Sequence, residues 1–360
     1  MRFVTIKKIV LPILCLGLML MSGCNAKESS VDSNNGKSQD SPIKIGFSMG
    51  TLQEERWQRD RDIFVARAKE LGAEVLVQNA NNINEDQIKQ VKYLIDQGID
   101  ILVIIPHDAE KCAESVQMAR RAGIKVISYD RLIRNAGTDL YVSFNNVKVG
   151  ELMAQALIEK VPKGNYVILK GAPTDYNSTM FDEGYMNVLD GPMEKGDITV
   201  VGETWCEDWA HEDAYNCVEQ TLGKGISIDA IVAANDSLAS AAIEALSENR
   251  LAGKVAVAGH DADLAACQRV VERTQLMTVY KPIDKIAKAA AEAAIKMVKG
   301  ENIDVDNNMI NDGKYEVPYL MIEPIPVTID NMKDTIIKDS FHRLEDIYIN
   351  VPKSQWPQLD

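Results

Sequence analysis

The chain has 360 residues, with 39 Lys or Arg against 53 Asp or Glu, and its formal net charge at pH 7 is −14. This length suggests about two domains and is sufficient to bury a sizeable core. The acidic balance argues against a nucleic-acid partner, because binding to phosphates requires a basic face. With only four His and no C-x-x-C spacing among the Cys residues, the sequence gives no support for a metal site.

Residues 1–23 have the pattern of a bacterial export signal. A basic start is followed by an apolar run that is too short to span a bilayer. The run ends in Leu-Met-Ser-Gly before Cys24, which resembles a lipobox, so we predict cleavage there and a lipid such as palmitate on Cys24. The predicted localisation is the extracytoplasmic face of the cell membrane. An ordinary secretory signal or an uncleaved anchor is the alternative. The polar stretch 24–41 predicts a flexible tether.

From residue 43 onward, strand patterns alternate with helix patterns. This alternation predicts βαβ units, and therefore an α/β fold with two Rossmann-like, doubly wound parallel-sheet lobes. Strands are predicted over 43–49, 73–78, 101–105, 125–129, 141–144, 166–170, 198–204, 228–233, 255–259, 276–280, 316–321 and 325–329. Helices are predicted over 54–71, 85–97, 109–122, 147–160, 180–193, 211–222, 237–248, 262–272 and 283–298.

Doubly wound sheets bind ligands beyond the carboxyl ends of their strands, so the residues that follow each strand are candidates for a site. Asp accepts hydrogen bonds from hydroxyls, Arg and Lys donate hydrogen bonds to oxygens, and Asn does both, while a Trp ring can cover an apolar sugar face. This composition predicts a site for a small polyhydroxylated molecule such as a sugar. The candidate residues are Arg56, Trp57, Asp130, Arg131, Asp175, Asn177, Trp209, Asn235, Asp261 and Lys281.

These residue types also have purely structural explanations. Trp57 is equally suited to the core, and Asp130 or Asp261 to a helix cap. We expect Asp236 to be the N-cap of the helix that follows it, and Trp205 to lie in the core.

Other classes of function fit the sequence less well. A pair such as Asp130 and Asp261 could serve as acid and nucleophile in a glycosidase, but the site carries as many donors as acids, which suits binding without catalysis. We therefore predict no enzyme activity and no cofactor. A ligand-regulated DNA-binding protein is disfavoured by the charge. Cys206 and Cys217 are candidates for a disulfide in an oxidising exterior, and unpaired thiols are the alternative.

Several short sequence motifs between residues 44 and 339 resemble those of one known family. The chain is similar to the type I periplasmic sugar-binding proteins of ABC transporters, and among them to those that bind D-xylose. The resemblance implies two lobes joined by a three-segment hinge, with the sugar between them. The matching words include Glu55-Arg56-Trp57-Gln58, Tyr129-Asp130-Arg131, Asp261-Ala262-Asp263-Leu264 and Met277-Thr278-Val279-Tyr280-Lys281-Pro282-Ile283.

The resemblance implies that Trp57 and Trp209 stack on the sugar and that the other candidates contact its hydroxyls. The loop around Asp175 and Asn177 matches the family only loosely, and His260 departs from it. The implied division of the chain is a signal peptide at 1–23, a tether at 24–41, an N-terminal lobe at 42–148 plus 286–322, a C-terminal lobe at 149–285 plus 323–345, and a tail at 346–360.

The implied function is capture of D-xylose, or a closely related aldose, and its delivery to the permease and ATPase subunits of an ABC transporter. The alternatives are another monosaccharide (glucose, ribose or arabinose) and a sugar sensor that feeds a membrane receptor.

Overall fold

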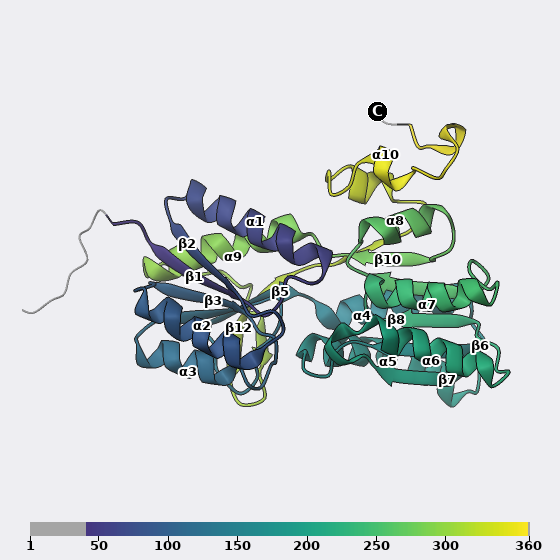
Figure 1. Cartoon of the computed structure of the whole chain (residues 1–360), viewed down its shortest axis with the longest axis horizontal. Helices are drawn as coiled ribbons and strands as arrows, with labels where there is room; N and C mark the ends of the chain where they lie inside the picture. The colour runs from purple at the N-terminus through teal and green to yellow at the C-terminus, as the bar shows by residue number, and fades with distance from the viewer. Residues whose placement is uncertain (1–40, 359–360) are drawn as a thin grey trace, which may run out of the picture. The chain divides into compact units, whose positions relative to one another are not determined.

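The structure is a computed structural model that describes residues 41–358. The chain from Pro42 onward forms one compact unit, which contains two α/β lobes (Figure 1). The predicted signal segment, Cys24 and nearly all of the predicted tether lie outside the described residues. Within residues 41–358, every helix is too short or too polar to cross a membrane.

The first lobe is built on a seven-stranded sheet in the order β11-β12-β5-β4-β3-β1-β2. Neighbouring strands run parallel except for the antiparallel pair β11 and β12. The interior strand β3 is buried along its whole length, as expected where helices cover both faces of a sheet. The strands are β1 (Lys44–Met49), β2 (Glu74–Asn79), β3 (Ile101–Ile105), β4 (Lys125–Tyr129), β5 (Leu140–Phe144), β11 (Met309–Asn311) and β12 (Glu316–Ile322).

Two pairs of helices cover the two faces of this sheet (Figure 1). One face packs against α1 (Glu55–Glu70) and α9 (Ile283–Val298), which contact each other. The opposite face packs against α2 (Asn84–Asp96) and α3 (Ala113–Arg121). Each face therefore has its own hydrophobic cluster. The cluster on the α1 face contains Met49 of β1 and Trp57 of α1, and so holds the start of α1 at the end of β1.

The second lobe has a six-stranded sheet in the order β13-β10-β9-β8-β6-β7, parallel except for the pair β10 and β13. Among its helices, α4 contacts α5 and α6 contacts α7. The predicted α/β class with two mostly parallel sheets is thus confirmed. The strands are β6 (Gly164–Lys170), β7 (Ile198–Trp205), β8 (Ala230–Ala233), β9 (Ala256–His260), β10 (Met277–Tyr280) and β13 (Ile325–Val327). The helices are α4 (Asn146–Lys160), α5 (Tyr176–Glu194), α6 (His211–Gly223), α7 (Asp236–Glu248) and α8 (Leu264–Val271), with the short turn η1 (Glu207–Trp209).

The chain passes between the lobes three times in the described residues. It crosses from β5 to α4, from β10 to α9, and from β12 to β13. The end of the chain, with η2 (Lys333–Ile337), α10 (Leu344–Ile347) and η3 (Lys353–Gln355), packs on the second lobe. Ile347 and Tyr348 there are buried in one hydrophobic cluster with Ala262. Ala262 directly follows Asp261, the first residue after β9.

Three observations decide between the earlier expectations. Asn235, and not Asp236, is the N-cap of α7, because its side-chain oxygen accepts a hydrogen bond from the amide of Leu238 at 2.9 Å. Trp205 is 37% exposed on the edge strand β7, so the expected core position is wrong. The thiols of Cys206 and Cys217 are unpaired, which matches the second alternative.

Candidate functional site

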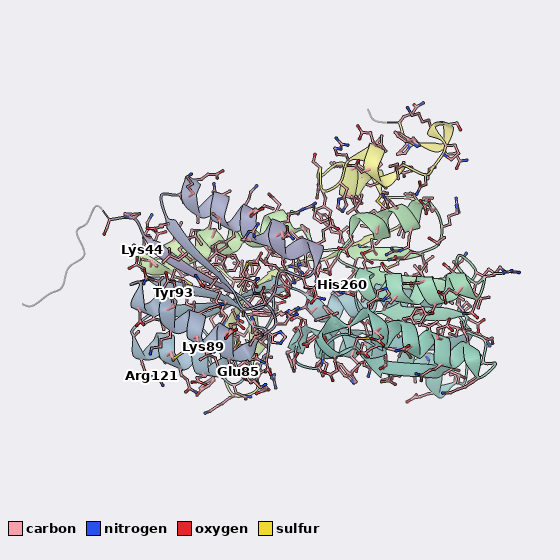
Figure 2. The ribbon with its side chains drawn as sticks, viewed as in Figure 1. Lys44, Glu85, Lys89, Tyr93, Arg121 and His260 are labelled. Carbon is pink, nitrogen blue, oxygen red and sulfur yellow. The ribbon has the colours of Figure 1, made fainter. Side chains whose placement is uncertain are left out.

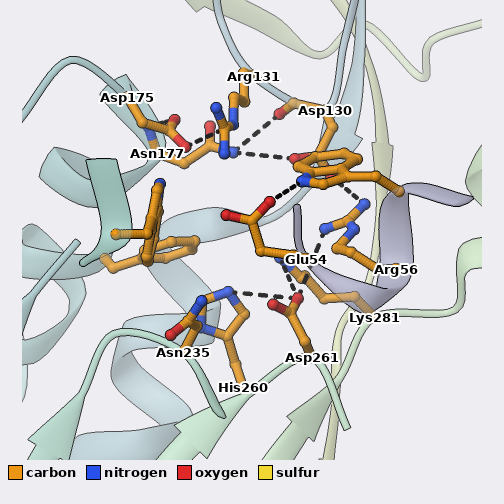
Figure 3. Close-up of a pocket in the computed structure, with 13 residues that line it drawn as sticks. Glu54, Arg56, Asp130, Arg131, Asp175, Asn177, Asn235, His260, Asp261 and Lys281 are labelled. Atoms are coloured by element: carbon orange, nitrogen blue, oxygen red, sulfur yellow. Dashed lines mark hydrogen bonds and ion pairs between the residues drawn. The ribbon is translucent and has the colours of Figure 1, made fainter. Parts of the chain in front are cut away.

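All ten predicted binding residues line a single cavity between the two lobes (Figure 3). Arg56 and Trp57 come from the first turn of α1, and Asp130 and Arg131 follow β4. The second lobe supplies Asp175, Asn177, Trp209, Asn235 and Asp261, and Lys281 follows β10 at a crossing between the lobes. The rule that ligands bind at the carboxyl ends of parallel strands therefore selected side chains that the fold brings together.

Arg56 is the centre of the charges on the first-lobe side. Its guanidinium is buried and lies 2.6 Å from Asp130 and 3.1 Å from Asp60, which is one helical turn away on α1. Asp60 also accepts a hydrogen bond from the hydroxyl of Tyr129. Burial lowers the pKa of Arg56, but Asp130, Asp60 and Asp261 outweigh burial and hold its pKa well above the usual value. The cation is thus fixed in place by three carboxylates.

On the second-lobe side, the backbone places several of the polar groups. Asp175 is the N-cap of α5 and accepts from the amide of Asn177 at 3.0 Å. Asp261 has a φ of 105°, in the left-handed region that residues other than glycine rarely adopt. Such strained conformations are frequent at functional sites. The carboxylate of Asp261 lies 2.9 Å from the ammonium of Lys281, and this cation with His260 and Arg56 lowers the pKa of Asp261 against the effect of burial.

Two ion pairs connect the lobes across the cavity. Arg131 contacts Asp175 at 2.7 Å, and Arg56 contacts Asp261 at 3.6 Å. The pKa of Asp175 is raised because burial outweighs the nearby cation of Arg131. These pairs give a cavity in which charged donors and acceptors alternate, which is the arrangement that can bind hydroxyl groups strongly.

The two tryptophans enter the cavity from opposite lobes. Trp57 is 2% exposed and lies 4.3 Å from the guanidinium of Arg56. Trp209 is 9% exposed, and its indole N–H has no partner among residues 41–358. The Nδ1 atom of His260 also has none. Buried polar atoms are nearly always hydrogen-bonded in proteins, so these two atoms indicate that the cavity is built to meet a polar ligand.

The predictions missed three residues that line the cavity, namely Glu54, Phe181 and His260. Phe181 lies one helical turn after Asn177 on α5, a spacing that places both on one side of the helix and could have indicated it. His260 lies on the second lobe, on the side that faces the first (Figure 2). It is buried, and desolvation and the cation of Lys281 lower its pKa to about 3.

Comparison with known proteins identifies the family. Residues 45–302 match the model of the periplasmic binding protein domain. This chain belongs to the periplasmic binding proteins. It is 47% identical over 320 residues to the D-xylose-binding periplasmic protein of Haemophilus influenzae, covering 89% of this chain and 96% of the relative. The D-xylose-binding periplasmic protein of Escherichia coli is 44% identical over 340 residues, covering 94% and 98%. The resemblance to D-xylose-binding periplasmic proteins, which the sequence motifs predicted, is confirmed.

These relatives also correct one prediction. Both are named as periplasmic proteins, so the expected localisation at the cell membrane through lipid on Cys24 is wrong. The lipobox-like segment before Cys24 was the basis of that expectation, and a small residue before a Cys is a short pattern that an ordinary export signal can also contain.

Solved structures of sugar-binding relatives share the fold. A carbohydrate transporter solute-binding protein from Chloroflexus aurantiacus, in complex with D-glucose, is 28% identical with a TM-score of 0.79, covering 85% of this chain and 98% of that one. An ABC transporter solute-binding protein from Clostridium phytofermentans with bound β-D-glucose is 27% identical, also at 0.79, covering 84% and 99%. The relatives are solute-binding proteins and not enzymes.

Proposed function

We propose that this protein captures D-xylose, or a closely related aldose, between its two lobes and delivers it to the permease and ATPase of an ABC transporter. The observation that carries the proposal is the cavity itself, in which Trp57 and Trp209 enter from opposite lobes among three cations and four carboxylates. Relatives that share nearly half of their residues with this chain are named for D-xylose.

The ten predicted residues have divided roles in this proposal. Trp57 and Trp209 cover the two apolar faces of the sugar ring, and the charged and amide groups pair with its hydroxyls. A buried site that pairs a particular hydroxyl rejects analogues that lack it, because its own polar groups are then left unpaired. Closure of the lobes removes the sugar from water, and the permease recognises the closed form.

Calorimetric titration of the compact unit from Pro42 onward with D-xylose tests the proposal, with D-glucose, D-ribose and L-arabinose in parallel. We expect one-to-one binding of D-xylose that Trp57→Ala abolishes. Preference for D-glucose would support the alternative that the protein captures another monosaccharide, which the glucose-bound structures favour. Heat from none of the four sugars would refute the assignment to an aldose.

The transport step needs a separate experiment. Uptake of labelled D-xylose by cells that carry the wild-type chain should exceed uptake by cells that carry the Trp57→Ala variant at equal expression. Equal uptake in both strains would favour a sensing role over delivery to a permease.

A further inference from the structure

Glu54 is a carboxylate in the cavity that neither the sequence prediction nor the named relatives assign to any role. It is the residue immediately before α1, with an extended backbone (φ −75°, ψ 147°), and its side chain makes no capping hydrogen bond to the helix. The carboxylate instead turns into the cavity, where Oε2 accepts a hydrogen bond from Nε1 of Trp57 at 2.5 Å (Figure 3). It therefore stands at the edge of one of the two indole rings.

The charge of Glu54 is not compensated as the other charges are. The remaining three carboxylates of the cavity each contact a cation: Asp130 contacts Arg56, Asp175 contacts Arg131, and Asp261 contacts Lys281. Across residues 41–358, Glu54 forms no ion pair, and its hydrogen bond from Trp57 uses only one of the lone pairs that a carboxylate offers. The group retains the capacity to accept further hydrogen bonds from a ligand.

Glu54 also borders a second space, next to the cavity, into which a ligand would extend. Besides the cavity described above, Glu54 lines a smaller adjoining cavity, together with Arg131 and Trp209. That neighbouring space has polar walls, which include Thr51, Asn82 and Asp208. Glu54 is half-buried at the junction of the two spaces, so its carboxylate can reach a group at the rim of a bound ring.

We propose that Glu54 is a specificity-determining residue that accepts a hydrogen bond from one hydroxyl of the bound sugar, at the edge of the Trp57 ring. This inference rests on the proposed function, and it adds a ligand contact on the first lobe. A charged acceptor makes a stronger hydrogen bond than a neutral one. The site therefore discriminates against aldoses that lack this hydroxyl or carry it as an ether.

The test is a thermodynamic cycle between Glu54 and the ligand. D-xylose and its four analogues that each lack one hydroxyl are titrated into the wild-type unit, Glu54→Gln and Glu54→Ala. Glu55→Ala is the matched control, because Glu55 is the next residue and its side chain is 51% exposed. We expect Glu54→Ala to weaken D-xylose binding about tenfold or more, Glu54→Gln to weaken it less, and Glu55→Ala to leave it within about twofold.

The analogues separate ligand contact from an indirect effect. If Glu54 contacts a hydroxyl, one analogue binds the wild-type unit weakly and loses nothing further in Glu54→Ala, while the other three lose as much as D-xylose does. An equal loss for all five ligands would mean that Glu54 only orients Trp57 and would overturn the proposal, as would an unchanged affinity for D-xylose. Wild-type protein that binds none of D-xylose, D-glucose, D-ribose and L-arabinose would refute the proposed function itself. Wild-type binding of D-xylose that Glu54→Ala leaves unchanged refutes this inference alone.

Discussion

The two walls of the cavity are held in place by different means. On the first lobe, Arg56 is fixed by side-chain ion pairs with Asp60 and Asp130. On the second lobe, Asn235 is fixed as the N-cap of a helix, and Trp209 has a φ of 61°. Asp130, which lines the cavity from the first lobe, also has this left-handed conformation, with a φ of 62°.

The difference indicates which kinds of change each wall tolerates. A wall held by charge fails when one partner of the network is removed, because the others remain buried without compensation. A wall held by backbone conformation tolerates loss of a charge but fails when a new atom displaces the chain. Substitutions on each wall therefore distinguish the two cases.

Arg56→Met should destabilise the first lobe strongly. The substitution keeps a long side chain but leaves Asp60 and Asp130 buried without their cation, and such losses cost about 3–5 kcal/mol of unfolding free energy. Urea denaturation measures the change. The control is Arg61→Met on the same helix, whose ion pair with the 67% exposed Asp62 should contribute less than about 1 kcal/mol.

A loss below about 1 kcal/mol in Arg56→Met would contradict the comparison. It would mean that the first-lobe wall does not depend on its charge network, and that Asp60 and Asp130 are satisfied by other groups once the cation is gone.

His260, on the second-lobe wall, should make the protein less stable in acid. Its pKa is lowered to about 3 in the fold by burial and Lys281, against an ordinary value near 6.5 in the unfolded chain. The contribution of neutral His260 to the free energy of unfolding is therefore complete above pH 6.5. It falls by up to about 1.4 kcal/mol per pH unit below pH 6.5 and is lost as the pH approaches 3. The cause is that, between these pH values, His260 binds a proton in the unfolded chain but not in the folded protein.

Urea midpoints at pH 6.5 and 4.5 check this expectation in the wild type and in His260→Asn. The variant should lose about 2 kcal/mol less between the two pH values, since Asn does not titrate. His107 and His342, whose pKa values burial also lowers, are present in both proteins and cancel in the difference. Parallel acid profiles for the two proteins would show that His260 is charged in the fold or exposed to solvent.

The sequence predicted the fold and the ten candidate residues for the same reason. Apolar runs such as β3 determine where parallel strands lie, and the residues after each strand then fall at one edge of the sheet. Glu54 escaped this reasoning because an acid before a helix is explained by the helix dipole alone, so its turn into the cavity leaves no signal. The sequence also does not decide whether Asn235 or Asp236 is the N-cap of α7, because both residue types cap helices well.

Gly171→Ala should weaken sugar binding through the second-lobe wall. Gly171 follows β6, and a Cβ atom there would lie 2.4 Å from Cη2 of Trp209 and 2.4 Å from the hydroxyl oxygen of Ser178. Trp209 must then shift from its position in the cavity, and we expect at least a tenfold loss of D-xylose affinity by calorimetry, with a loss of stability of about 1–3 kcal/mol. The control is Gly191→Ala on α5, where a Cβ meets nothing within 4 Å and the affinity should be unchanged.

Gly171→Ala changes no charge, so its outcome bears directly on the contrast between the walls. If affinity falls at least tenfold while the variant still unfolds cooperatively in urea, with no more than the expected loss of stability, then the position of the Trp209 ring, set by the backbone, determines binding on this side. If affinity is unchanged, the ring can shift without cost, and sugar binding on the second lobe must depend on its charged groups.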